Sequence, residues 1–161
     1  MLETVTEKMI NYFGSDIRRI NHAIKVQSFA NLIIKGETLE PVIHTIVDYA
    51  AILHDISIKE AERKYGFSKS HYQEKEGAIV AKNLLKKIGI YKAIIERVCF
   101  IIAHHHTYDL IDGIDFQTIV EADFIVNIHE CNINKENIEQ IKQKLFNTTM
   151  GIKLPKYMYK T

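Results

Sequence analysis

The chain has 161 residues, about the length of one domain, which is enough to bury a sizeable hydrophobic core. Hydrophobic residues make up 47% of it and charged residues 25%, a globular composition that excludes a disordered or fibrous chain. The 21 Lys and Arg residues balance the 20 Asp and Glu residues, and a net charge of +1 argues against binding to nucleic acid or to an anionic membrane surface.

The sequence predicts helices along most of its length. Only two prolines and seven glycines interrupt it, which favours long helices over a β architecture with many turns. In chain order, we expect helices over about residues 2–13, 15–35, 41–54, 60–65, 70–88, 91–106, 116–130 and 135–146, with a loop over 107–115. Gly14, Gly36 and Gly89 end three of them, and Pro41 fits the first turn of another. The expected fold is therefore an all-α bundle in a single domain.

Other features of the sequence indicate a cytoplasmic protein. Cys99 and Cys131 are far apart and belong to no recognisable motif, which suits a reducing compartment. The longest apolar run, 98–103, is far shorter than the roughly 18 to 20 residues that a membrane span needs. The N-terminal residues MLETVTEKM carry acids where a secretory signal carries bases.

Four predicted helices each carry an ionisable residue on the apolar stripe that faces the core. His22, for example, shares its stripe with Val26 and Ile33. The four residues are His22, His54, His105 and Asp123. A single case of this kind is usually a hydrogen-bonded core residue, but four on separate helices call for a common explanation.

A metal ion between the helices would provide that explanation. A buried carboxylate such as Asp123 destabilises a fold unless a cation makes its charge favourable. Neutral imidazoles and carboxylates together suit Fe, Mn, Ni, Co or Zn. Asp55 follows His54 directly and lies about 100° away around the helix, so it reaches the same site only where the helix ends.

The order of these motifs resembles the HD-domain superfamily of metal-dependent phosphohydrolases, whose fold is an all-α bundle. The resemblance rests on His22, then AAILHDI with His54 and Asp55, then IIAHHH, then EADFIVNI with Asp123, and it spans about residues 18–130. It implies that His22, His54, Asp55 and Asp123 are metal ligands. It also implies one HD-type domain over 1–161, with a motif-bearing core at about 15–131 and a C-terminal helix and tail at 132–161.

The resemblance further implies a divalent metal ion and a phosphorylated substrate. The candidates for the metal are Mn, Fe, Co, Ni, Mg or Zn, with one or two ions per chain. The expected reaction is hydrolysis of a phosphomonoester or phosphodiester, with a nucleotide as the preferred candidate, by hydroxide that the metal generates. Members with more than one metal often have a histidine shortly before a Gly-Ala pair; here His71 lies six residues before Gly77, so the number of ions stays open.

Several residues are candidates for catalysis. Asp55 is expected to bridge the ions if two are bound. His104 or His105 is expected to serve a second metal or contact the phosphate. Glu74 is a candidate oxygen ligand or acid/base, against the alternative of an exposed helical glutamate. Lys25, one turn beyond His22, is a candidate for contacting a substrate phosphate, with a solvated surface lysine nearly as good an interpretation.

The remaining histidines are given structural interpretations. His106 is expected at the rim or helix end, where its charge is favourable against the helix dipole. His44 and Asp48 are four residues apart and are expected to form a surface pair, with a metal site as the weaker alternative. His71 and His129 are expected on the surface.

The C-terminal segment combines lysines and tyrosines in a way that also occurs in nucleic-acid-binding proteins. The residues are Lys153, Lys156, Lys160, Tyr157 and Tyr159. Three lysines close to a chain end are more often a solvated, frayed tail, and we expect that here.

Two other functions remain open. One is a metal-stabilised module that binds a nucleotide or a protein partner without turnover. The other is an HD-type di-iron oxygenase, which needs a complete second set of iron ligands. The expected partner is a small phosphorylated substrate, and the sequence leaves a homodimer open.

Overall fold

The computed structural model describes residues 1–160, and within this range the chain forms nine α-helices, one short 3-10 helix and no strand. The expected all-α fold is confirmed. The elements are α1 (Leu2–Phe13), α2 (Ile17–Ile34), α3 (Pro41–Leu53), α4 (Ile58–Tyr65), α5 (Ser70–Ile88), α6 (Lys92–His104), η1 (Tyr108–Leu110), α7 (Ile114–Glu130), α8 (Lys135–Leu145) and α9 (Thr149–Tyr159).

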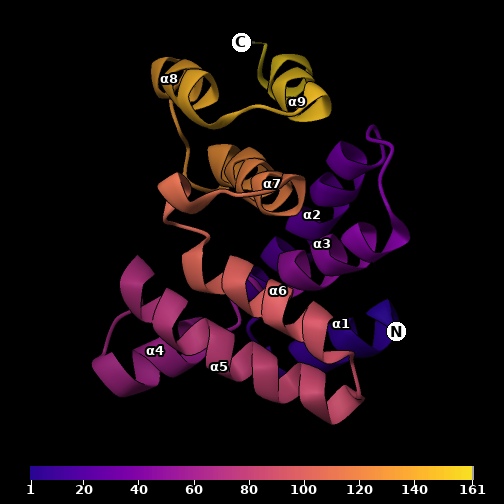
Figure 1. Cartoon of the computed structure of the whole chain (residues 1–161). Coiled ribbons are helices and arrows are strands. Elements are labelled where there is room, and N and C mark those ends of the chain that lie inside the picture. The colour runs from indigo at the N-terminus through magenta and orange to yellow at the C-terminus, as the bar shows by residue number, and fades with distance from the viewer. Residues whose placement is uncertain (161) are drawn as a thin grey trace.

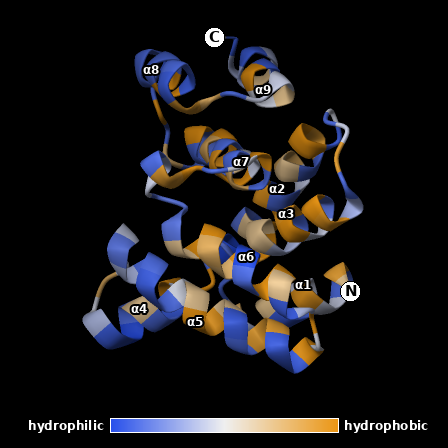
Figure 2. Ribbon diagram, viewed as in Figure 1, coloured by the Kyte–Doolittle hydropathy of each residue, from blue (hydrophilic) through white to orange (hydrophobic). Residues whose placement is uncertain are grey.

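The helices stack from one end of the molecule to the other. Helices α1, α4 and α5 form one end, α8 and α9 the other, and α2, α3, α6 and α7 lie between them (Figure 1). Helix α5 packs against α6, and α2 packs against both α3 and α7. The apolar residues of these central helices point inward, so orange and blue alternate along each ribbon (Figure 2). The largest fully buried side chains include Met9, Ile33, Leu53, Ile101 and Phe116.

Most helix boundaries agree with the sequence prediction to within two residues. Asp16 accepts a hydrogen bond from the backbone nitrogen of Arg19 and so caps the start of α2. Helix α7 begins at Ile114, two residues earlier than expected, because Asp115 in its first turn is held by the guanidinium of Arg97 at 2.6 and 2.7 Å. The predicted loop contains η1.

The prediction of a solvated tail is wrong for residues 149–159, which form α9. Thr148 begins this helix by accepting a hydrogen bond from the backbone nitrogen of Gly151 at 3.0 Å. Tyr159 donates to the carbonyl oxygen of Ile125 at 2.9 Å, so α9 is tied to α7. The sequence did not predict α9, because Pro155 interrupts the helical pattern of residues 149–159. The lysines of this segment are exposed, as expected.

A buried carboxylate on α7 holds the start of α9. Glu121 has no exposed surface and accepts hydrogen bonds from the backbone nitrogens of Asn147 and Thr148 and from the Thr148 hydroxyl. Gln117 donates to the same carboxylate at 2.7 Å. Gly151 is required beside it, because a Cβ at that position would clash with the Glu121 carboxylate.

None of the helices in the described part of the chain is both long enough and apolar enough to cross a membrane.

Candidate metal centre

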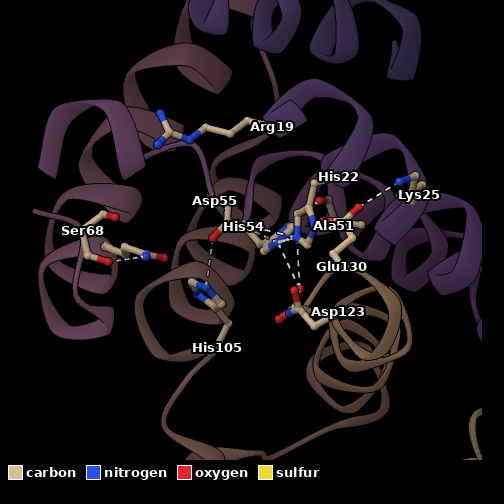
Figure 3. A network of polar contacts seen from close by, with 12 residues as sticks. Arg19, His22, Lys25, Ala51, His54, Asp55, Ser68, His105, Asp123 and Glu130 are labelled. Atoms are coloured by element: carbon tan, nitrogen blue, oxygen red, sulfur yellow. Dashed lines mark hydrogen bonds and ion pairs between the residues drawn. The ribbon is translucent and has the colours of Figure 1, made fainter. Parts of the chain in front are cut away.

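The four residues expected to bind metal lie together where α2, α3 and α7 meet (Figure 3). The Nε2 atoms of His22 and His54 are 3.2 Å apart, and Asp123 Oδ1 lies 3.1 Å from His22 Nε2 and 3.7 Å from His54 Nε2. Asp55 Oδ2 lies 3.6 Å from His54 Nε2 and 3.7 Å from His22 Nε2. Residues separated by up to 101 positions in the chain therefore converge on one point.

The end of α3 brings two consecutive residues to the same point. Helix α3 ends at Leu53, so His54 is its C-cap residue and Asp55 lies in the turn that follows. The backbone nitrogen of Ile56 donates to the carbonyl oxygen of Leu53, and that of Ile58 to Asp55, which closes this turn. Because Asp55 lies in this turn, its side chain is not bound to the 100° offset between neighbours on a continuous helix and can face the same point as His54.

The hydrogen bonds of the three buried imidazoles fix which ring nitrogen carries the proton. His54 Nδ1 lies 2.8 Å from the carbonyl oxygen of Ala51, and His105 Nδ1 lies 2.8 Å from that of Ile102. A carbonyl oxygen only accepts, so both Nδ1 atoms donate and both Nε2 atoms present a lone pair when the rings are neutral. His22 Nδ1 donates in the same way to Glu130 Oε2 at 2.9 Å.

The cluster is consequently rich in acceptors that face one another. When His22 is neutral, its Nε2 lone pair and that of His54 point at each other and at the Asp123 carboxylate. His105 Nε2 is buried, has no hydrogen-bond partner among residues 1–160, and faces Asp55 Oδ1 at 3.7 Å. A buried acceptor without a donor is costly, and a shared cation removes that cost for all of these atoms at once.

Electrostatics in the metal-free cluster follow the same pattern. Burial disfavours the charged form of His22, but the carboxylates of Asp123, Asp55 and Glu130 outweigh it and raise the pKa of His22 to about 9. Burial lowers the pKa of His54. Burial opposes the ionised form of Asp55 and of Asp123, yet the neighbouring imidazoles keep the pKa of both carboxyls below the ordinary value. Both carboxylates therefore stay ionised at neutral pH and attract positive charge.

The donor atoms form two adjoining groups, each of which could hold a metal ion. The first contains His22, His54 and Asp123, and the second contains Asp55, His105 and His106. Within each group the ligand atoms lie within 4.8 Å of one another. Asp55 turns Oδ2 toward the first group and Oδ1 toward His105, so its carboxylate lies between the two. Imidazole nitrogen with carboxylate oxygen fits a divalent transition metal.

Three of the residues expected to take part in catalysis lie outside both groups. His104 packs its ring against Phe100, with centroids 4.8 Å apart. Glu74 accepts hydrogen bonds from the backbone nitrogen of His106 at 3.1 Å and from the Thr107 hydroxyl at 3.0 Å, so it holds the turn after α6. The exposed Lys25 donates to Glu130 Oε1 at 2.9 Å. Of the two histidines left open by the sequence, His105 is the one brought to the cluster.

Three further residues belong to the site but were missed by the sequence reasoning. His106 was assigned to the rim, yet it is only partly exposed and lies in the second group. Glu130 orients His22, and Asn127 donates to Asp123 Oδ1 at 2.9 Å. The signal for the last two was present in the sequence, because they follow Asp123 by four and seven residues on the same face of α7.

Of the predictions for the remaining histidines, two are confirmed and one is wrong. His71 and His129 are exposed, as expected. The expected pairing of His44 with Asp48 is wrong, because Asp48 Oδ1 instead accepts hydrogen bonds from the side-chain amides of Gln27 and Asn31 at 2.9 and 2.7 Å. Two amides on the adjacent helix α2 satisfy this carboxylate better than one imidazole on its own helix.

A cavity of about 290 Å³ opens onto the cluster. It is lined by residues from α2, α4, α7 and the segments on either side of α4: Arg18, Arg19, His22, Asp55, Ile58, Glu62, Ser68, Asn127 and Glu130. The candidate ligands His22 and Asp55 are therefore accessible to a small molecule.

Comparisons with known proteins place this arrangement in a known fold. No family model matches the sequence, and no curated protein matches it. The crystal structure of a predicted HD superfamily hydrolase from an uncultured Thermotogales bacterium matches the structure with a TM-score of 0.70. This chain has the HD-domain fold. The match covers 97% of this chain and 83% of the other, with 22% sequence identity.

The HD-domain fold does not by itself define an activity. One fold can carry many functions, so the activity has to be argued from the side chains of the site. For this chain the argument depends on the acceptors of the two groups and on the cavity that opens onto them.

Proposed function

We propose that this chain is an HD-superfamily hydrolase that cleaves phosphoester bonds with the help of a divalent metal ion. The observation that supports this most strongly is the convergence of three buried Nε2 atoms on two ionised carboxylates. Such an arrangement needs a positive charge among these atoms; in the metal-free cluster the proton on His22 supplies it, and a bound metal ion would take the place of that proton. Its position at a cavity supports a catalytic role over a purely structural one.

In this proposal His22, His54 and Asp123 hold one ion. Asp55, with one oxygen toward each group, is shared with a second ion when His105 and His106 also bind one. When bound, a divalent metal supplies a nucleophilic hydroxide near neutral pH and polarises a phosphoryl oxygen.

The residues around the ions have defined tasks. Glu130 holds the His22 ring by accepting from Nδ1, and the Ala51 and Ile102 carbonyls hold His54 and His105 in the same way. Asn127 orients Asp123 through a hydrogen bond to Oδ1. Fixed ligands of this kind keep the metal geometry from relaxing during the reaction. The cationic side chain of Arg18 at the cavity favours an anionic substrate, and a nucleotide is the preferred candidate.

The test is metal analysis of the purified protein, followed by hydrolysis assays on nucleotides and simple phosphoesters with Mn, Co, Ni, Mg and Fe. We expect His54→Ala and Asp55→Ala to abolish activity. His129→Ala and Asp109→Ala are matched controls, because both residues are exposed and lie outside the two groups. Circular dichroism shows whether each variant folds, and Asp123→Asn provides a near-isosteric ligand variant if His54→Ala does not fold.

Two results would overturn the proposal. The first is full activity in folded Asp55→Ala and Asp123→Asn. The second is tight nucleotide binding without turnover with any of these metals, which would instead support the non-catalytic binding module.

A further inference from the structure

The cavity at the metal centre contains one cationic side chain that the described structure leaves without a counter-ion. Arg18 lies in the first turn of α2, four residues before His22, so the two side chains share one face of the helix. Arg18 lines the cavity together with His22 and Asp55. An arginine in this position can reach a substrate that is seated at the cluster.

The other cations near the cluster are already paired. Arg19 contacts Glu62 at 2.6 Å and Asp16 at 3.0 Å. Lys25 contacts Glu130 at 2.9 Å. For Arg18, residues 1–160 offer no ion pair and no hydrogen bond to a side chain. Its guanidinium therefore keeps its full capacity to form bidentate hydrogen bonds, the geometry that matches a phosphate group.

A second cavity continues from Arg18 away from the cluster. It measures about 600 Å³, shares Arg18 and Arg19 with the first cavity, and adds Lys59. Its only carboxylate, Asp16, already accepts from the backbone nitrogen of Arg19 and pairs with the guanidinium of that residue. The larger cavity thus has an excess of positive charge next to the smaller one.

A third cavity, on the other side of the cluster, has an apolar lining and no excess of positive charge. It lies beyond the Lys25–Glu130 pair, measures about 290 Å³, and has a largely apolar lining that includes Phe29, Val126 and Met158. An anionic group is not stabilised there, because the two charges at its edge neutralise each other. The charged part of a substrate is therefore directed toward Arg18.

We propose that Arg18 binds a second phosphate group of the substrate, so that the enzyme prefers a phosphoanhydride such as a nucleoside diphosphate over a monophosphate. This inference rests on the proposed function, since the terminal phosphate has to lie at the metal centre. Water adds to the terminal phosphorus, the bond from that phosphorus to the bridging oxygen breaks, and ADP yields AMP, inorganic phosphate and a proton. Arg18 contacts the inner phosphate, which stays on the leaving group, and the nucleoside occupies the larger cavity.

The experiment compares ADP with AMP in wild type, Arg18→Ala and Arg63→Ala. Arg63 is a matched control, because it is exposed on α4 and lines neither cavity. We expect the wild type to show a kcat/KM for ADP at least about 10-fold above that for AMP, as one charge-assisted hydrogen bond supplies. Arg18→Ala should remove this difference, mainly through KM, and Arg63→Ala should keep it. Arg18 is exposed, so its replacement leaves the fold intact.

Binding measurements separate a failure of this inference from a failure of the proposed function. Calorimetric titration of the Mn-loaded protein with ADP and AMP needs no turnover. If neither ADP nor any phosphoester is hydrolysed, yet ADP binds at least about 10-fold more tightly than AMP and only Arg18→Ala removes the difference, the role of Arg18 stands while the hydrolase proposal falls. Equal affinity for ADP and AMP, or an equal loss of both in Arg18→Ala, overturns the role of Arg18 whether or not turnover is observed.

Discussion

Replacing Glu130 tests whether the buried imidazoles are held as metal ligands. Glu130 Oε2 accepts from His22 Nδ1 at 2.9 Å and Oε1 accepts from Lys25 at 2.9 Å, so this carboxylate sets both the ring orientation and the tautomer of His22. Removing such a partner typically lowers metal affinity by about 10- to 100-fold, which corresponds to roughly 1.4 to 2.8 kcal/mol. The losses of metal affinity in Glu130→Gln and Glu130→Ala should lie at opposite ends of that range.

Glu130→Gln retains an oxygen that can accept from His22 Nδ1, so we expect a loss of about 10-fold. Glu130→Ala removes the acceptor altogether and should lose about 100-fold. The assay is calorimetric titration of the metal-free protein with Mn²⁺ or Zn²⁺. Glu96→Gln is the control, because that carboxylate is exposed and, within residues 1–160, its only ion pair is with Lys92. Unchanged affinity in Glu130→Ala would refute the reasoning, since His22 would then need no partner to present Nε2.

Further predictions concern stability. Saturating metal at about 100 times its dissociation constant should stabilise the fold by roughly 2.7 kcal/mol, so EDTA treatment should lower the melting temperature by several degrees, which calorimetry measures. Glu121→Ala should destabilise the fold by about 3 to 5 kcal/mol in urea unfolding, because it leaves the buried backbone nitrogen and hydroxyl of Thr148 without their acceptor and removes one of the two acceptors of Gln117; a loss below about 1 kcal/mol would contradict this. Hydrogen bonds from Lys64 and Tyr65 hold the pKa of Glu76 below its ordinary value of 4.5, so its contribution is present above pH 4.5 and is lost as the pH falls through the folded-state pKa. In acid titrations Glu76→Gln should therefore show a shallower loss of stability than the wild type.

The helices could be predicted from the sequence because their signals are local. Gly89 ends α5 with a backbone φ of 83°, a conformation that favours glycine, and Pro41 begins α3. The exception is α9, whose stability depends on a residue far away in the chain. Its first turn is held by Glu121 on α7, and no local pattern reveals a cap that comes from another helix.

The residues of the candidate site also divide into those that a local pattern predicts and those whose positions depend on contacts between helices. The stripe containing Val98 and Ile101 placed His105 inward correctly, because the periodicity of α6 extends to its last turn. His106 could not be placed by that argument, since the helix ends at His104 and the following residues turn away from its axis. The position of Glu74 could not be predicted for a related reason. Its carboxylate holds the turn at His106, a contact that exists only after α5 and α6 have packed together.

The end of α3 explains how two adjacent residues can serve two ions. On a continuous helix His54 and Asp55 would point about 100° apart, and only one of them could face the cluster. Because α3 stops at Leu53, His54 completes the first group and Asp55 lies between the two groups. Asp55 Oδ2 is 3.6 Å from His54 Nε2, and Oδ1 is 3.7 Å from His105 Nε2. If two ions bind, a single change at Asp55 should weaken both. Asp123→Asn should weaken only the first, so titrating the two variants with metal distinguishes one ion from two.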